Sequence, residues 1–317
     1  MTGPTTASVV VCAYTEDRWP RLQAALDSVL AQQPPPSEVI LVVDHCPPLV
    51  RRARDTWGDS LTVVENAGSQ GLSAARNTGV AAATADVVAF LDDDAVAEPG
   101  WLAGHLRHYD DPAVVGVGGL VVPLWERSEP SWFPGEFGWV VGCSYVGLPD
   151  RPAAVRNPIG ANMSFRRDVL DRVGGFAEAL GRVGAQSQGC EETELSIRAT
   201  SDVPGGRIVH DPSAVVRHAV PPSRGRWTYF RQRCWSEGRS KAQVSALAGP
   251  RAGLASERAY VRRTLPRGVA RNLATAARQR DLAHAARAGA IVAGLTFTTA
   301  GYVTGLSRRA HPRGATT

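Results

Sequence analysis

The chain has 317 residues, a formal net charge of +5, and hydrophobic and charged fractions of 44% and 21%. These fractions are those of an ordinary globular protein. The chain is long enough for one large domain with an appendage or for two domains. Its cysteines show no C-x-x-C spacing, which argues against a disulfide framework or a structural zinc site and favours a reducing cytoplasm. No signal peptide is expected, because the apolar run at 8–12 is too short.

The charge is unevenly distributed along the sequence. Residues 217–317 hold eighteen Arg and one Lys against three acids, a net charge of +16, whereas residues 1–216 carry −11. An acidic body with a basic tail predicts that the tail faces an anionic partner, either a membrane surface or phosphate groups. A nucleic-acid partner is not expected, because no nucleic-acid-binding motif accompanies the charge.

The first ninety residues alternate between two patterns. Short apolar runs rich in β-branched residues predict strands at 7–13, 38–44, 61–65 and 87–91, and the runs at 7–13 and 87–91 are expected to be buried. Segments with helical apolar spacing lie between these runs, at 21–32, 51–57 and 72–83. This alternation predicts βαβ units and a largely parallel sheet, which is an α/β fold.

The pattern is less regular beyond residue 94. Further strands are expected at 113–122, 160–165 and 214–218, and further helices at 102–109, 167–173 and 189–198. Residues 125–157 are rich in Trp, Pro and Gly, and we expect them to form a loop region that shapes a substrate site. Beyond Pro221-Pro222 the sequence is helical and Arg-rich, which predicts a domain at 1–220 and a basic helical region at 221–317.

Residues 288–307 contain no charged side chain and are flanked by Arg287 and by Arg308-Arg309. Twenty residues match the thickness of a bilayer, but the many Gly, Ala and Thr residues make insertion marginal. The segment can therefore be a membrane span, a helix lying in the membrane interface or a packing helix of a soluble protein. The flanking Arg residues match anionic headgroups and favour some contact with a membrane.

Three consecutive carboxylates, Asp92, Asp93 and Asp94, follow the predicted strand at 87–91. The carboxyl ends of strands are where open α/β sheets bind their ligands. Carboxylates this close repel one another unless a cation neutralises them, and hard oxygen ligands suit Mg²⁺ or Mn²⁺. The sequence thus predicts a cation site here, the alternative being a solvated acidic turn.

From about residue 6 to 220 the chain resembles family-2 glycosyltransferases. Four segments carry the resemblance, in order and spacing: SVVVCAYTE (8–16), VILVVD (39–44), GLSAARNTGVAAATADVVAFLDDD (71–94) and GCEETELSIR (189–198). The resemblance implies the GT-A fold, a Rossmann-like mixed sheet, here with an Arg-rich helical C-terminal extension. A dinucleotide-binding oxidoreductase is excluded, because 13–16 reads AYTE where that class needs G-x-G-x-x-G.

The resemblance implies a metal site and a catalytic base. Asp92 and Asp94 match the metal-binding D-x-D motif, with Asp92 towards the nucleotide, Asp94 on a Mn²⁺ or Mg²⁺ ion and Asp93 between them, and His218 matches a third metal ligand. Glu191 and Glu192 match the position of the base that takes the acceptor proton. Glu192 aligns with an Asp of the family and is preferred, but its extra methylene leaves Glu191 as a second candidate.

Nucleotide and sugar contacts are also implied. The nucleotide-binding set on this basis contains Asp92 and Asp93. It also includes residues at the ends of the first two strands and on the helix before the acids: Ala13, Tyr14, Glu16, Asp44 and Arg76. Ordinary packing of Tyr14, a helix cap by Asp44 and an intrahelical ion pair of Arg76 are the alternatives. The donor and acceptor set is Asn162, Arg233 and Trp235; Asn162 can instead make a buried structural hydrogen bond, and Trp235 can instead be a core aromatic.

Together these patterns predict an inverting, metal-dependent glycosyltransferase. It would move a sugar from a nucleoside diphosphate donor to a hydroxyl of a lipid-linked (for example polyprenyl-linked), glycan or small-molecule acceptor. We expect it in the cytoplasm at the inner face of the cell membrane, held there by the basic C-terminal region. The alternative is a catalytically degenerate protein that only binds nucleotide sugars or a partner.

Overall fold

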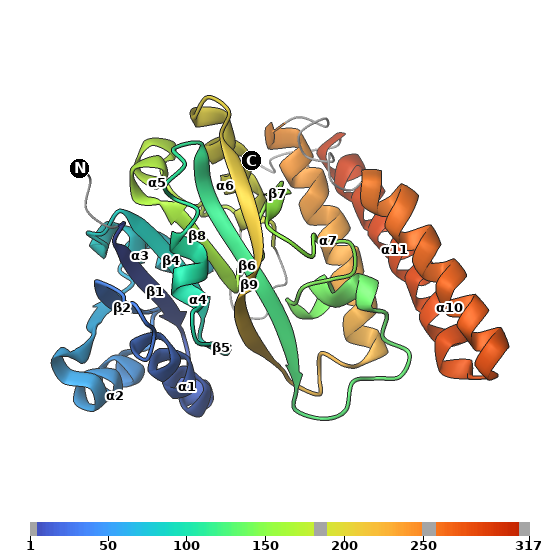
Figure 1. Cartoon of the computed structure of the whole chain (residues 1–317), viewed down its shortest axis with the longest axis horizontal. Helices are drawn as coiled ribbons and strands as arrows, with labels where there is room; N and C mark the ends of the chain where they lie inside the picture. The colour runs from blue at the N-terminus through green and yellow to red at the C-terminus, as the bar shows by residue number, and fades with distance from the viewer. Residues whose placement is uncertain (1–4, 181–188, 249–257, 311–317) are drawn as a thin grey trace, which may run out of the picture.

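The computed structural model describes residues 5–180, 189–248 and 258–310, with side chains described up to 246 and 307 at the ends of the last two ranges. The side chains of Arg308 and Arg309, which flank the uncharged segment, therefore lie outside the described part. The chain folds around a nine-stranded sheet of order β3-β2-β1-β4-β8-β6-β9-β5, with β7 paired to β9 off this path. The strands of the sheet cross the middle of the molecule in Figure 1.

The first half of the sheet is parallel, as the sequence predicts. Its strands are β1 (Ala7–Ala13), β2 (Glu38–Val43), β3 (Thr62–Glu65) and β4 (Val87–Asp92). The connecting helices are α1 (Trp19–Leu30), α2 (Pro47–Trp57) and α3 (Leu72–Ala82). α2 begins four residues before the predicted helix because proline is favoured in a first helical turn. A Cβ at Gly79 would lie 2.4 Å from Val10 Cγ1, so the glycine brings α3 close to the sheet.

The second half of the sheet is mixed. Its strands are β5 (Ala95–Ala97), β6 (Val114–Trp125), β7 (Ala153–Val155), β8 (Asn162–Arg166) and β9 (Arg207–Val220). β8 runs antiparallel to β4 and β6, whereas β6 and β9 are parallel. The helices of this half are α4 (Trp101–Leu106), α5 (Arg167–Val173) and α6 (Glu191–Asp202). β9 is far longer than the predicted strand at 214–218, because a register shift between Gly119 and Leu120 accommodates residues 212–214 and lets the strand continue on both sides of them.

The region 125–157 contains a short helix, η3 (Gly135–Val141), and packs on α7 (Trp227–Ala248). Aromatic rings join the two: Phe137 and Phe230 lie 5.3 Å apart between centroids, and Trp132 lies 5.5 Å from Phe230. Phe230 also belongs to the same buried cluster as Trp101 on α4. The hydrophobic core is therefore continuous across residue 220, where the sequence predicts a domain boundary.

The C-terminal helices pack side by side at one end of the molecule (Figure 1). They are α7, the π-helical turn η4 (Tyr260–Thr264), α10 (Leu265–Gln279) and α11 (Leu282–Ala310). Small residues allow the close approach of α11, because a Cβ at Gly301 would lie 2.1 Å from the carbonyl oxygen of Trp235. Residues 282–307 are long and apolar enough to cross a membrane, with a mean hydropathy of 1.3, although core helices of soluble proteins pass the same test.

Candidate functional site

Two carboxylates and an imidazole meet where β4 ends. Asp92 is the last residue of β4, Asp94 lies in the turn to β5, and His218 on β9 pairs with the first residue of β5. One ligand atom from each of the three side chains lies within 4.8 Å of the others. Carboxylate oxygens suit Mg²⁺ and Mn²⁺, and the added imidazole favours the transition metal. These three residues can therefore hold a divalent cation.

Arginines balance the buried acids. Burial alone would raise the pKa of Asp94, but the hydrogen bond from His218 and the charges of Arg224 and Arg18 hold that pKa below its usual range. Burial and the charge of Asp94 raise the pKa of Asp93 to about 7, and the Arg18 guanidinium limits this rise. Arg18 Nη1 donates to Asp93 Oδ1 at 2.9 Å. Asp94 is thus ionised and can act as a cation ligand, whereas the Asp93 carboxylate points to Arg18.

Arg76 connects the metal site to the start of α6. Its buried guanidinium lies 3.3 Å from Asp92 Oδ1 and 3.0 Å from Glu191 Oε1, and it also donates to the carbonyl of Gly160 at 3.1 Å. The alternative of an intrahelical ion pair is wrong, since both acidic partners lie outside α3. Arg76 therefore fixes the distance between the cation-binding acids and the glutamates of α6.

Glu191 and Glu192 occupy the first turn of α6, after Cys190 in a left-handed conformation with φ 76°. Glu191 is buried and forms an ion pair with Arg76. Burial, followed by the charge of Glu191, raises the pKa of Glu192 to about 8. A carboxylate with such a pKa is a strong base when ionised and titrates near neutral pH. Glu194 forms an ion pair with Arg198 at 2.6 Å, as the i, i+4 spacing of the two residues suggests.

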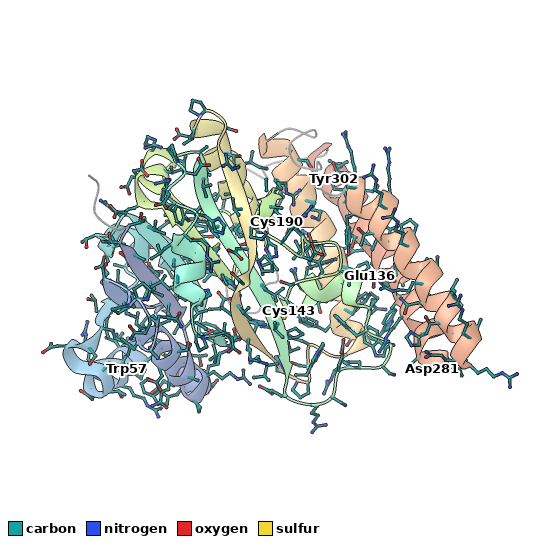
Figure 2. All side chains as sticks on the ribbon, in the orientation of Figure 1. Trp57, Glu136, Cys143, Cys190, Asp281 and Tyr302 are labelled. Atoms are coloured by element: carbon teal, nitrogen blue, oxygen red, sulfur yellow. The ribbon has the colours of Figure 1, made fainter. Side chains whose placement is uncertain are left out.

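A cavity of about 330 Å³ joins these residues to the C-terminal helices. The end of the cavity at the cation-binding group is lined by the ionisable residues Arg76, Asp92, Glu191, Glu192, His218 and Arg224. Aromatic and aliphatic side chains from η3, η4, α10 and α11 line the other end: Phe137, Trp139, Tyr260, Leu265, Leu295 and Tyr302. Figure 2 labels Cys190 and Tyr302, which both line this cavity.

Residues 8–174 match the sequence pattern of Glycosyl transferase family 2. The chain belongs to that family. The glucosyl-dolichyl phosphate glucuronosyltransferase of Haloferax volcanii is 37% identical over 243 residues, which cover 76% of this chain and 77% of the relative. The pre-mycofactocin glycosyltransferase of Mycobacterium tuberculosis is 31% identical over 162 residues, covering 50% of this chain and 32% of that protein. The predicted family and enzyme class are thus confirmed.

Solved structures confirm the predicted GT-A fold. The mannosyltransferase PcManGT of Pyrobaculum calidifontis, in complex with GDP-Man and Mn²⁺, matches 99% of this chain and 89% of its own with a TM-score of 0.61 and 23% identity. GalNAc-T7 with UDP, GalNAc and Mn²⁺ matches 68% of this chain and 44% of its own with a TM-score of 0.52 and 19% identity. Both of these transferases hold Mn²⁺, and this family-2 chain has in Asp92, Asp94 and His218 a group that can hold such an ion.

The residues predicted to bind the nucleotide lie around the ends of β1 and β2. Tyr14 is 46% exposed, with the Arg18 guanidinium 5.2 Å from its ring centroid, so it is not packed in the core. Ala13 is buried and its carbonyl accepts from the Asp44 amide at 2.7 Å, while Glu16 lies 3.7 Å from an Arg52 nitrogen at the surface.

Asp44 organises the turn before α3. Its carboxylate accepts from Asn66 Nδ2 at 2.7 Å and from the Gly71 amide at 3.0 Å, and the alternative of a helix cap is wrong because α2 has no side-chain cap. The Gly71 φ of 141° is one that glycine adopts without strain, which lets the chain turn tightly into α3. Nucleotide contact by this group of residues remains a prediction.

The three residues predicted to contact the donor or the acceptor lie in different surroundings. Arg233 lines the cavity. The Asn162 side chain is fully buried and fits the structural alternative, since its amide group bonds Trp101, His105 and two backbone carbonyls. Its predicted contact with donor or acceptor is therefore not supported. Trp235 is partly exposed on α7 and is not among the described residues that line the cavity, so it is neither a core aromatic nor a wall of this space.

Several residues at the site are not predicted from the motifs. Arg18 and Arg224 lie beside the acids, and Glu237 and Lys241 line the cavity on α7. Glu237 and Lys241 follow Arg233 at intervals of four residues in a helical segment, and this spacing is a signal that would place all three on one helix face.

Proposed function

We propose that this chain is an inverting, metal-dependent glycosyltransferase that uses a nucleoside diphosphate sugar. The acceptor would be a hydroxyl of a lipid-linked, glycan or small-molecule compound. The observation that carries the proposal is that one cavity is lined by two members of the cation-binding group, by Arg76 and by the paired glutamates of α6. These are the groups that departure of a nucleoside diphosphate and activation of a hydroxyl require.

A divalent cation bound by Asp92, Asp94 and His218 would neutralise the charge that grows on the leaving diphosphate. Arg224 lines the same end of the cavity, 3.9 Å from Asp94, and adds a fixed positive charge there. Arg76 keeps Asp92 in place through its guanidinium. These fixed charges are oriented before the donor binds, so little reorganisation is needed during the reaction.

Glu192 would take the proton from the acceptor hydroxyl as the oxygen attacks the anomeric carbon. Glu191 has a fixed partner in Arg76, 3.0 Å away, whereas burial raises the pKa of Glu192, which favours Glu192 for proton transfer. A single displacement with this base inverts the anomeric configuration, and NMR of the product's anomeric proton would check that outcome.

The site is tested by a panel of nucleotide sugars with Mn²⁺. Wild-type protein should release nucleoside diphosphate from one donor, and Asp94→Asn should lower the rate of release by about 100-fold or more. Donor binding without release in the wild type would instead indicate a degenerate nucleotide-sugar-binding protein.

We further propose that the protein acts in the cytoplasm, bound to the inner face of the cell membrane. The exposed side of α11 carries Val292 and Val303, and the exposed Arg262, Arg263 and Arg267 lie on η4 and α10. Such a combination suits an anionic bilayer surface. The Val292→Glu/Val303→Glu variant should sediment less with phosphatidylglycerol vesicles than the wild type, and unchanged sedimentation would contradict membrane docking.

A further inference from the structure

One face of α7 presents three charged side chains to the middle of the cavity. Arg233, Glu237 and Lys241 all line it, with exposed side-chain fractions of only 8%, 14% and 18%. Glu237 lies 3.5 Å from Arg233 Nη2 and 3.3 Å from Lys241 Nζ. Two cations thus share this carboxylate, and the three side chains together carry one net positive charge inside a largely buried space.

This charged stripe lies next to the proposed catalytic base. The Cys190 thiol donates to Glu237 Oε1 at 3.5 Å, and Cys190 directly precedes the glutamates of α6. Asp92 and His218 line the same cavity at its catalytic end. The stripe is therefore a second site for negative charge, on an element separate from the strands that hold the cation group.

Beyond the stripe the cavity wall is apolar and preformed. The hydroxyl of Tyr260 donates to the carbonyl of Glu136 and accepts from Trp139 Nε1, so its polar atom is used by the fold and its ring remains for the cavity. The buried Glu136 carboxylate pairs with Arg271 Nη2 at 2.6 Å, which fastens η3 to α10. Leu295 of α11 extends the same wall.

Resting on the proposed function, we infer that the α7 stripe and the apolar wall form the acceptor subsite, and that the acceptor carries a phosphate group joined to an apolar chain. Arg233 and Lys241 would bind the phosphate by charge-assisted hydrogen bonds, with Glu237 holding both in position. The chain would cover the rings and aliphatic side chains of the wall, where removal of apolar surface from water stabilises the complex. A neutral sugar would not use the net positive charge that the three side chains of the stripe carry.

Four probes separate the two halves of this subsite in calorimetric titrations: geranyl phosphate, geraniol, glucose 1-phosphate and inorganic phosphate. Geranyl phosphate should bind wild-type protein at least about tenfold more tightly than each of the others, a difference of about 1.4 kcal/mol. Lys241→Gln should remove the advantage over geraniol, and Lys241→Arg should keep most of it. Arg239→Gln, on the exposed side of the same helix, should bind geranyl phosphate as the wild type does.

Equal binding of geraniol and geranyl phosphate by the wild type would overturn the inference, and so would equal binding of glucose 1-phosphate. A loss of binding in Arg239→Gln as large as in Lys241→Gln would also overturn it. Thermal melting of each variant checks that the fold is intact, and Lys241→Arg tests the charge if Lys241→Gln unfolds. Donor cleavage is a separate measurement: the absence of nucleoside diphosphate release in the wild type contradicts the proposed function, whereas the titrations decide the subsite by themselves.

Discussion

The guanidinium of Arg76 donates to Glu191 Oε1 at 3.0 Å, and both side chains are buried although they lie 115 positions apart in the sequence. Arg76 comes from the helix that precedes the cation-binding acids, and Glu191 opens the helix that carries the proposed base. The pair therefore holds together the two halves of the catalytic site. Burial alone would lower the pKa of Arg76, but the charge of Glu191 at this distance raises it.

Removing one member of this pair should be costly. Arg76→Gln leaves Glu191 and Asp92 without their shared cation, and we expect the free energy of unfolding to fall by about 3 kcal/mol. Urea denaturation followed by circular dichroism measures this change. The double variant Arg76→Gln/Glu191→Gln should recover part of the loss because the isolated carboxylate is gone. Arg172→Gln, which breaks only exposed pairs, is the control and should hardly change stability.

The first half of the fold follows directly from the sequence because its signals are local. A strand that is buried on both faces must be an apolar run, and the three acids at the end of β4 mark the edge at which ligands bind. The positions of β1, β2 and β4 and the place of the acids are therefore predictable, whereas β3, which is not buried, is indicated by its place in the strand–helix alternation. The sequence predicts Arg76 as a residue of the site. It does not predict the pairing of Arg76 with Glu191, because tertiary packing brings these two side chains together.

The rest of the fold and of the site depends on contacts between segments that are far apart in the sequence. β5 has three residues and forms only because β9 is beside it. The Asn162 side chain is held in the interior because Trp101 and His105 of α4 form hydrogen bonds with it. A change in composition near residue 220 predicts that the C-terminal helices form a separate region. Aromatic contacts through Phe230 instead pack them against the core, and they form a wall of the cavity.

The cation-binding group makes a direct prediction. Asp94→Asn removes a charged ligand, and we expect activity to fall by about 100-fold or more, since cation stabilisation of the leaving group contributes several kcal/mol. His218→Gln should weaken Mn²⁺ binding by about 10-fold to 100-fold and lower activity less at saturating Mn²⁺. Calorimetric titration with Mn²⁺ and nucleoside diphosphate release measure the two effects. Asp110→Asn, an exposed acid outside this group, is the control. Wild-type Mn²⁺ affinity in both ligand variants would contradict the assignment.

Glu192 predicts how activity depends on pH. Burial raises the pKa of its carboxyl to about 8, so the side chain is mostly protonated at pH 6 and cannot accept a proton there. The value of kcat/KM should rise about tenfold per pH unit below pH 8 and level off above it. Glu192→Gln should lose about 10²-fold to 10⁴-fold in rate and show no such rise. An unchanged pH profile in Glu192→Gln would assign the proton transfer to another group, with Glu191→Gln as the next variant to measure.

Two glycines of α11 predict opposite effects of the same substitution. A Cβ at Gly301 would lie 2.1 Å from the backbone oxygen of Trp235, so Gly301→Ala should push α11 away from α7 and lower the free energy of unfolding by about 1 to 3 kcal/mol. A Cβ at Gly289 meets no atom within 4 Å among the described residues, so Gly289→Ala should raise it by up to about 1 kcal/mol through helix propensity alone. Urea titration of both variants measures the difference. Equal effects of the two substitutions would mean that α11 does not pack on α7 as closely as the glycines allow, and the wall that we assign to the acceptor would then lose its support.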